Sequence, residues 1–165
     1  MVILKASGKL HLSNYGKDLR SLAMYQKGRE FIVAALLLRN EDRAGYVYLH
    51  LVCQGVEIIF KSLLLFKDYK TYKPKLGNRK LFGHDLCKVV NVWSKKLNGG
   101  RVNKKFYKEI EALNDHYKGH NLRYGSNLDI FLTPRSFKTT EIIRQLQRTL
   151  LKTNKMLERK GLMDK

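Results

Sequence analysis

The chain has 165 residues, 44% of them hydrophobic, which is enough for one domain whose core needs neither disulfides nor metal. Lys and Arg number 33 against 14 Asp and Glu, so the formal net charge at pH 7 is +19. The composition excludes a disordered chain, and the charge indicates a phosphate-bearing or otherwise acidic partner.

Residues 1–14 are expected to form an N-terminal tail or a small hairpin, followed by a single helical-bundle domain over residues 15–165. The first residues lack the long apolar region of a secretory signal, and no segment reads as a membrane span. Cys53 and Cys87 read as reduced core residues. We therefore expect a soluble, cytoplasmic protein with no membrane partner.

Helical spacing of apolar residues predicts a first helix from about Tyr15 to Leu38, in which Gly28 is a potential weak point. After a short connection, residues 45–66 are apolar on nearly every side, which is typical of a central, buried helix. A connection this short makes the two helices antiparallel neighbours.

The polar residues of the central helix fall on one of its faces, and they are His50, Gln54, Glu57 and Lys61. Unpaired ionisable groups are costly to bury, so this polar line must meet water, a ligand or a partner side chain. Two interpretations stay open. The line is either the wall of a groove for a nucleotide or phosphate, or an internal Glu57 and Lys61 pair that holds the bundle together, with His84 bonding to it.

Residues 68–83 have no periodicity, and we expect a long, functional loop there. Tyrosines alternate with lysines in it, a pattern suited to stacking on unpaired bases. The loop supplies one set of predicted nucleic-acid-binding residues: Lys70, Tyr72, Lys73, Lys75, Arg79 and Lys80.

Three further helices are expected. An apolar stripe after Asp85, a suitable N-cap, predicts one that stops at Gly99 and Gly100. The next should run over about 102–124, with its acidic residues such as Glu109 facing solvent, and the last over about 136–160. The last helix presents a basic stripe, the second predicted nucleic-acid-binding set: Arg144, Arg148, Lys152, Lys155 and Arg159.

These elements predict an all-α fold, an up-and-down four-helix bundle with a fifth helix packed against it. Three short motifs also resemble the HEPN family of small helical domains. They are the run Gln54-x-x-Glu57-x-x-x-Lys61-x-Leu63-Leu64, the tripeptide His84-Asp85-Leu86, and Arg123-Tyr124 at the end of a later helix. The resemblance implies a HEPN-like bundle, and it implies Tyr124 as a further ligand-binding candidate beside the polar line.

Catalytically active HEPN proteins use an Arg-x(4–6)-His motif on a late helix, paired across a dimer. Here Arg79 and His84 match that spacing, but they do not lie on a late helix, where the order is His116, His120, Arg123. These five residues are the catalytic candidates for a metal-independent ribonuclease, in which histidines transfer protons and arginine stabilises the phosphorane. His116 and His120 alone make no metal site, because a third ligand is missing, and no cofactor is expected.

The leading hypothesis is a HEPN-like module that binds RNA or nucleotide phosphate through its basic faces without efficient catalysis, and whether it is an enzyme stays open. One alternative is a HEPN-type ribonuclease, the toxin of a toxin–antitoxin pair. The other is a subunit that partners a nucleotidyltransferase and exposes an apolar patch for it. The resemblance also implies a homodimer.

Overall fold

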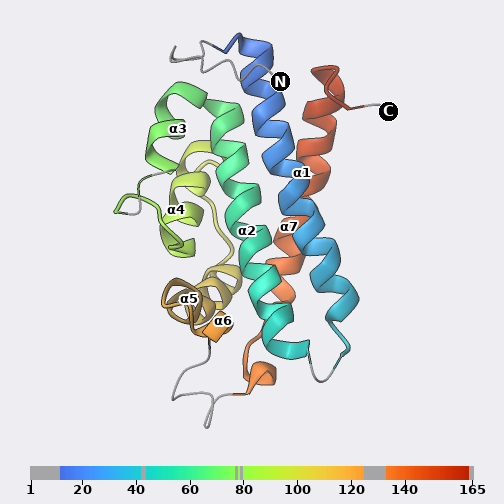
Figure 1. The fold of residues 1–165 in the computed structure, drawn as a ribbon, viewed down its shortest axis with the longest axis vertical. Coiled ribbons are helices and arrows are strands. Elements are labelled where there is room, and N and C mark those ends of the chain that lie inside the picture. Colours follow the sequence, from blue (N-terminus) through green and yellow to red (C-terminus); the bar gives the residue numbers. More distant parts are fainter. Residues whose placement is uncertain (1–11, 42–43, 77, 79, 125–132, 164–165) are drawn as a thin grey trace, which may run out of the picture.

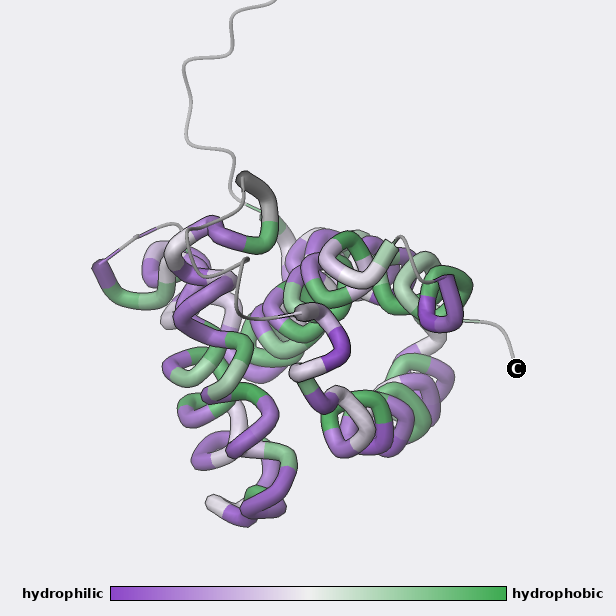
Figure 2. Tube along the Cα trace, turned by 90° about the horizontal axis from the view of Figure 1, so that it is seen from below, coloured by the Kyte–Doolittle hydropathy of each residue, from purple (hydrophilic) through white to green (hydrophobic). Residues whose placement is uncertain are grey.

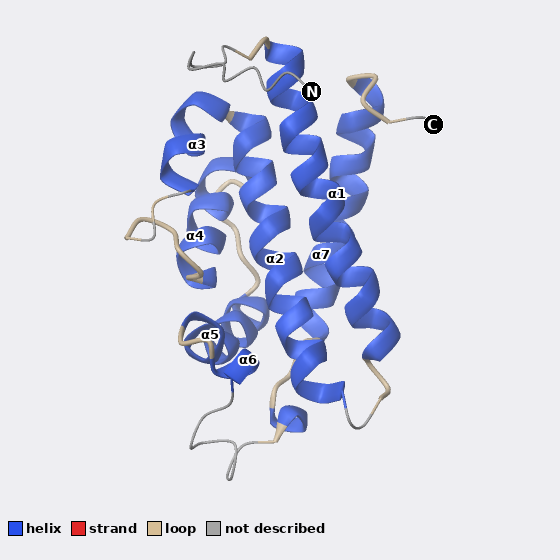
Figure 3. Cartoon of the chain, viewed as in Figure 1, coloured by secondary structure: helices blue, strands red, loops and turns tan. Residues whose placement is uncertain are grey.

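A computed structural model of the protein describes residues 12–41, 44–76, 78, 80–124 and 133–163. Every regular element in this part of the chain is a helix (Figure 3), which confirms the all-α prediction. The expected tail or hairpin at residues 1–14 lies mostly outside the described residues.

Helix α1 (Asn14–Leu38) and helix α2 (Gly45–Lys67) lie side by side and run in opposite directions (Figure 1), as their short connection predicted. Two glycines face each other at their crossing. A Cβ atom on Gly28 would lie 2.7 Å from Ile59 Cγ1, and one on Gly55 would lie 2.3 Å from Ile32 Cδ1. The structure does not test Gly28 as a weak point of the helix, but it shows that the absence of a side chain there lets α1 and α2 pack closely.

Helix α2 is the central element, since it also contacts α3, α4, α5 and α6. Its length and apolar composition alone would let it cross a membrane, although the sequence analysis read no segment as a membrane span. However, 72% of its apolar window is buried within the bundle. Burial of this kind is what a central core helix requires.

Helix α3 (Tyr69–Leu76) occupies the segment predicted to be a long loop. Asp68 Oδ1 accepts a hydrogen bond from the backbone N–H of Thr71 at 3.0 Å, which caps the first turn, and Tyr72 packs into the core. The prediction failed because a helix of eight residues with Pro74 inside it shows little apolar periodicity.

Helix α4 (Leu86–Leu97) begins as predicted, with Asp85 Oδ1 accepting from the backbone N–H of Lys88 at 3.0 Å. Helix α5 (Lys104–Lys118) is tied to it, because Asn114 Oδ1 accepts from the backbone N–H of Leu86 at 2.7 Å. In Figure 1, α5 is seen nearly end-on, so its axis crosses those of α1 and α2.

The fourth helix does not continue to residue 124 as predicted. Gly119 is the C-cap of α5, and His120 follows with φ of +62°, in the left-handed region where a helix ends. The short helix α6 (Asn121–Tyr124) then begins as a separate element. His116 and His120 therefore do not share a helix.

After the 3₁₀ turn Pro134–Ser136, helix α7 (Thr140–Arg159) runs along the long axis of the molecule beside α1 (Figure 1). Glu109 Oε2 of α5 accepts from the backbone N–H groups of Glu141 and Ile142 at 2.8 and 3.0 Å and so caps α7. The expectation that Glu109 faces solvent was wrong. Hydrophobic and hydrophilic residues alternate along the helices in Figure 2, as amphipathic packing requires.

Candidate functional site

A network of buried polar groups surrounds Glu57 on α2. Its Oε1 lies 2.6 Å from Lys61 Nζ, and its Oε2 accepts from the Tyr117 hydroxyl at 2.5 Å and lies 3.0 Å from His84 Nδ1. Lys61 Nζ also donates to the backbone carbonyl of Gly83 at 2.6 Å. The network joins α2 to α5 and to the turn before α4. Of the two interpretations that the sequence left open, the structure therefore has the second, an internal pair of Glu57 and Lys61.

Burial and hydrogen bonding act in opposite directions on the Glu57 carboxyl, which is 6% exposed. Burial alone raises its pKa, but the Lys61 ammonium and the donors on Tyr117 and His84 outweigh this and hold the pKa below its usual range. Glu57 is therefore ionised at neutral pH and fixes the orientation of the His84 ring.

Two histidines meet at the edge of this network. The rings of His84 and His120 are 5.4 Å apart between centroids, and the His84 side chain is 41% exposed. The rings of His84 and His50 each lie 5.8 Å from that of Tyr117. The predicted contact of His84 with the polar line is confirmed, whereas the proximity of His120 was missed because the break after α5 had not been foreseen.

The remaining polar and catalytic candidates are placed less closely together. His116 packs its ring against Phe137 at 5.0 Å, and Gln54 is half-buried on α2. Arg79 and the side chains of Arg123 and Tyr124 lie outside the described part of the molecule. Among the described residues, no group of three or more His, Cys, Asp or Glu side chains is placed to hold a metal ion.

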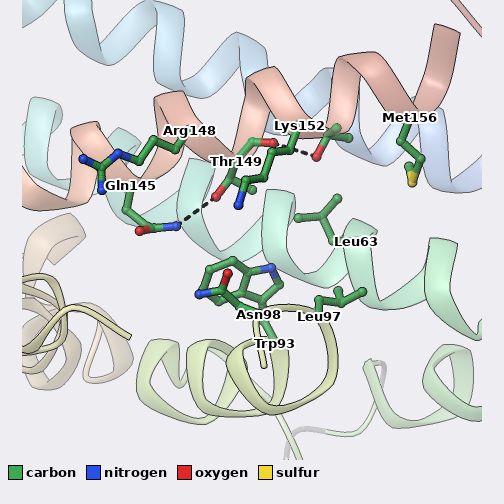
Figure 4. A pocket seen from close by; sticks show the side chains of 10 residues that line it. Leu63, Trp93, Leu97, Asn98, Gln145, Arg148, Thr149, Lys152 and Met156 are labelled. Atoms are coloured by element: carbon green, nitrogen blue, oxygen red, sulfur yellow. Dashed lines mark hydrogen bonds between the residues drawn. The ribbon is translucent and has the colours of Figure 1, made fainter. Parts of the chain in front are cut away.

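A groove of about 380 Å³ lies between α4 and α7, over a different face of α2 (Figure 4). Its apolar lining is contributed by Leu63, Trp93, Leu97 and Met156. Its remaining lining residues are polar or cationic: Asn98, Gln145, Arg148, Thr149, Lys152 and Thr153. No acidic residue is among them, so the groove combines an apolar floor with a positive wall.

The groove was missed in the sequence because α4 and α7 are separated by more than 40 residues. The cationic side of the groove was predicted, since Arg148 and Lys152 belong to the predicted basic stripe of α7. No other signal could have placed them opposite Trp93. The Trp93 ring itself is held in the core, stacked on Phe60 at 4.4 Å between centroids.

The described members of the predicted basic sets are exposed and form no ion pair with a carboxylate of the described chain, with two exceptions. Arg144 forms an ion pair with Glu141, and Tyr72 is only 6% exposed and lies under Lys75, so its ring does not offer a surface for stacking. The other described members are exposed: Lys70, Lys73, Lys75 and Lys80 around α3, and Arg148, Lys152, Lys155 and Arg159 on α7. Within the described chain, none of these eight forms an ion pair with a carboxylate.

Comparisons of the chain with protein-family models, with curated proteins and with solved structures find no match.

Proposed function

We propose that this protein binds single-stranded RNA, with the groove between α4 and α7 as the centre of the interface. The observation that carries the proposal is the pairing of Arg148 and Lys152 with an apolar floor in a groove whose described lining has no acid. Exposed cations attract phosphate groups, and Leu97 and Met156 offer apolar contact to a base, whereas Trp93 is only 4% exposed and forms the base of the floor without offering a ring face for stacking.

Further cations extend this surface beyond the groove. Lys95, Lys96 and Arg101 are exposed at the end of α4 and in the turn after it, beside the groove residues Leu97 and Asn98. A strand longer than one nucleotide would meet these charges on leaving the groove. Recognition is then led by the phosphate backbone and depends steeply on salt.

Resemblance to the HEPN family forms part of the same proposal. Two of its motifs, the Gln-x-x-Glu run on α2 and the His-Asp-Leu tripeptide before α4, meet through the bond between Glu57 and His84. This contact supports a HEPN-like bundle in which the polar network has a structural role and the positive groove a binding role.

Replacing both groove cations, as Arg148→Ala with Lys152→Ala, is expected to weaken binding of single-stranded RNA. Each lost phosphate contact reduces the slope of log K against log salt by about 0.7, so the slope should become shallower by about 1.4. Fluorescence anisotropy with a labelled oligonucleotide across a salt series measures both quantities.

A matched control removes the same charges from α1, as Arg20→Ala with Lys27→Ala. Both residues are exposed and neither lines the groove. Equal losses of affinity in the two double variants would mean that net charge alone attracts RNA, and would contradict a specific interface. Affinity that stays constant from low to high salt would contradict binding led by phosphate.

A second candidate function is metal-independent cleavage of RNA, and the proximity of His84 and His120 favours it. A carboxylate that orients one imidazole beside a second is suited to acid–base catalysis, in which one ring removes the 2′-hydroxyl proton and the other protonates the leaving oxygen. In this arrangement the exposed ring edges of the two histidines would face the scissile phosphate.

If this second function is present, His84→Ala and His120→Ala should each slow cleavage by about 10²-fold or more, while His116→Ala should not. The measurement is the rate of appearance of RNA fragments on a denaturing gel in the presence of a metal chelator. RNA that stays intact with the unaltered protein, or activity that survives both substitutions, would exclude it.

A further inference from the structure

A second concave site, the α4–α5 hollow, lies between α4 and α5 and has a volume of about 490 Å³. The two helices are neighbours in the bundle (Figure 1). The side chains that matter for its chemistry come from α4, from the turn after it and from α5, and they are Ser94, Lys95, Val102, Lys104, Tyr107 and Lys108. None of these residues lines the groove between α4 and α7, so the hollow is a separate site.

Ser94 brings an unsatisfied polar group to this hollow. The residue is 2% exposed, and its Oγ forms no hydrogen bond within the described chain. A serine or threonine hydroxyl inside a helix can bond to the backbone carbonyl four residues earlier. Ser21 and Thr153 do so at 2.9 and 2.8 Å, whereas Ser94 does not. Because an unpaired buried hydroxyl is costly, a bound hydrogen-bond acceptor beside Ser94 would be stabilising.

Three ammonium groups surround the same hollow without a countercharge. Lys95, Lys104 and Lys108 are exposed, and none of them forms an ion pair with a carboxylate of the described residues. Glu111 is the single acid among the described lining residues, so cations outnumber it three to one. The local field therefore favours an anion.

The rest of the lining is largely apolar. Val102 and the ring of Tyr107 are half-buried in it, and the methylene stems of the lysines add further hydrocarbon surface. Sites for small molecules typically have such a lining, in which a few polar groups fix the orientation of the ligand. Here those groups are one hydroxyl and the ammonium groups.

We propose that the α4–α5 hollow binds a small carboxylic acid with an apolar body. The carboxylate accepts a hydrogen bond from the Ser94 hydroxyl, which rotation about the Cα–Cβ bond turns toward the hollow, and it pairs with the lysine ammonium groups. The apolar body packs on Val102 and Tyr107. A free phosphate would leave this apolar lining in water, and a neutral hydrocarbon would leave Ser94 unpaired, so only an amphipathic anion uses both parts of the site.

A series of three probes separates the two parts of the site. In isothermal titration calorimetry below its micelle-forming concentration, octanoate should bind at one site per chain. Acetate keeps the carboxylate without the hydrocarbon and should bind at least about 10-fold more weakly. Octylammonium keeps the hydrocarbon with the opposite charge and should not bind. No binding of octanoate, or equal binding of octanoate and octylammonium, would overturn the proposal.

Ser94→Ala tests the buried hydroxyl and should weaken octanoate binding by about 10-fold or more, because a hydrogen bond to a charged acceptor is lost. Its melting temperature should stay unchanged or rise, since the free protein loses no hydrogen bond and alanine favours a helix. A fall in melting temperature would contradict the unpaired hydroxyl. Octanoate affinity that survives the substitution would overturn the proposed contact.

Lys104→Gln with Lys108→Gln tests the charge and should also weaken octanoate binding by about 10-fold or more. The matched control is Lys105→Gln with Lys118→Gln, which removes the same charge from the same helix. Both control residues are exposed and neither lines the hollow. Equal losses of affinity in the two double variants would mean that net charge alone attracts the anion, and would overturn the site.

The groove between α4 and α7 is the alternative location, because it also combines apolar and cationic side chains. Arg148→Ala with Lys152→Ala should leave octanoate binding unchanged, and Ser94→Ala should leave RNA binding unchanged, so the two proposals can fail separately. In a heteronuclear NMR titration with octanoate, the amide signals of Ser94, Gly100 and Tyr107 should shift. Shifts confined to the groove, or octanoate binding lost in the groove variant, would overturn the assignment to the hollow.

Discussion

Replacing Glu57 by Gln is expected to lower the free energy of unfolding by about 3–5 kcal/mol at pH 7. The substitution keeps the shape of the side chain but leaves the Lys61 ammonium, 5% exposed, without a countercharge. Lys61 Nζ keeps its bond to the Gly83 carbonyl, which satisfies one donor and does not neutralise the charge. Chemical denaturation followed by circular dichroism measures the loss.

Removing the whole pair should cost less than removing one partner. The double variant Glu57→Gln with Lys61→Met leaves no buried charge, so its loss should be smaller than the sum of the two single losses. Asp18→Asn is the control, because Asp18 pairs with Lys160 at 2.9 Å at the partly exposed surface and should change stability by only about 0–1 kcal/mol. Additive losses, or a Glu57→Gln loss as small as that of the control, would contradict the network.

The pH dependence of the same comparison has a defined sign. Because the folded protein holds the pKa of Glu57 below its ordinary value, Glu57 stabilises the fold above the unfolded-state pKa of about 4.3. That contribution is lost as the pH falls through the lower pKa of the folded state. The difference in stability between the unaltered protein and Glu57→Gln should therefore shrink below about pH 4.

The longer helices could be predicted from the sequence because several local signals agree in each. Helix α4 combines an apolar stripe with an N-cap at Asp85 and a stop at Gly99 and Gly100, both of which adopt positive φ. Helices α1, α2 and α7 likewise end within a few residues of their expected bounds. The spacing of apolar residues and the helix caps depend on neighbouring residues only, so both can be recognised in a single sequence.

The two errors in the predicted secondary structure occurred where tertiary contacts, and not the local sequence, determine the backbone conformation. Helix α3 is short and basic, and it contains Pro74. Burial of Tyr72 stabilises it, and no local sequence pattern indicates that burial. The break after α5 depends on His120 taking a left-handed conformation that usually favours glycine. Gly119 was the only indication in the sequence that the helix ends here, but the next residue, His120, takes the left-handed conformation.

The candidate site was only half predictable for a related reason. The polar line on α2 and its bond to His84 followed from spacing, because buried charges need partners. Tyr117 lies 60 residues away from Glu57 in the sequence, and no local pattern indicated that its hydroxyl completes the network. The groove depends on how α4 and α7 lie across α2, and that arrangement rests on contacts between elements far apart in the sequence, such as the Glu109 cap of α7.

Gly28→Val is expected to lower the free energy of unfolding by about 3 kcal/mol or more, because the space beside Gly28 is already filled. Its Cβ would lie 2.7 Å from Ile59 Cγ1 and 3.0 Å from the backbone nitrogen of Ile59. A side chain can turn away, but the backbone nitrogen can move only with α2, and α2 contacts almost every other helix.

Helix propensity sharpens the interpretation of this result, since valine is a better helix former than glycine and would by itself stabilise α1. Ile59→Ala in the Gly28→Val background should recover part of the lost stability, whereas Ile59→Ala alone should cost about 2–5 kcal/mol by leaving a cavity. Thermal and urea unfolding of the unaltered protein, the two single variants and the double variant measures this double-mutant cycle. Stability unchanged by Gly28→Val, or purely additive losses, would mean that the two helices do not approach as closely as Gly28 and Gly55 allow.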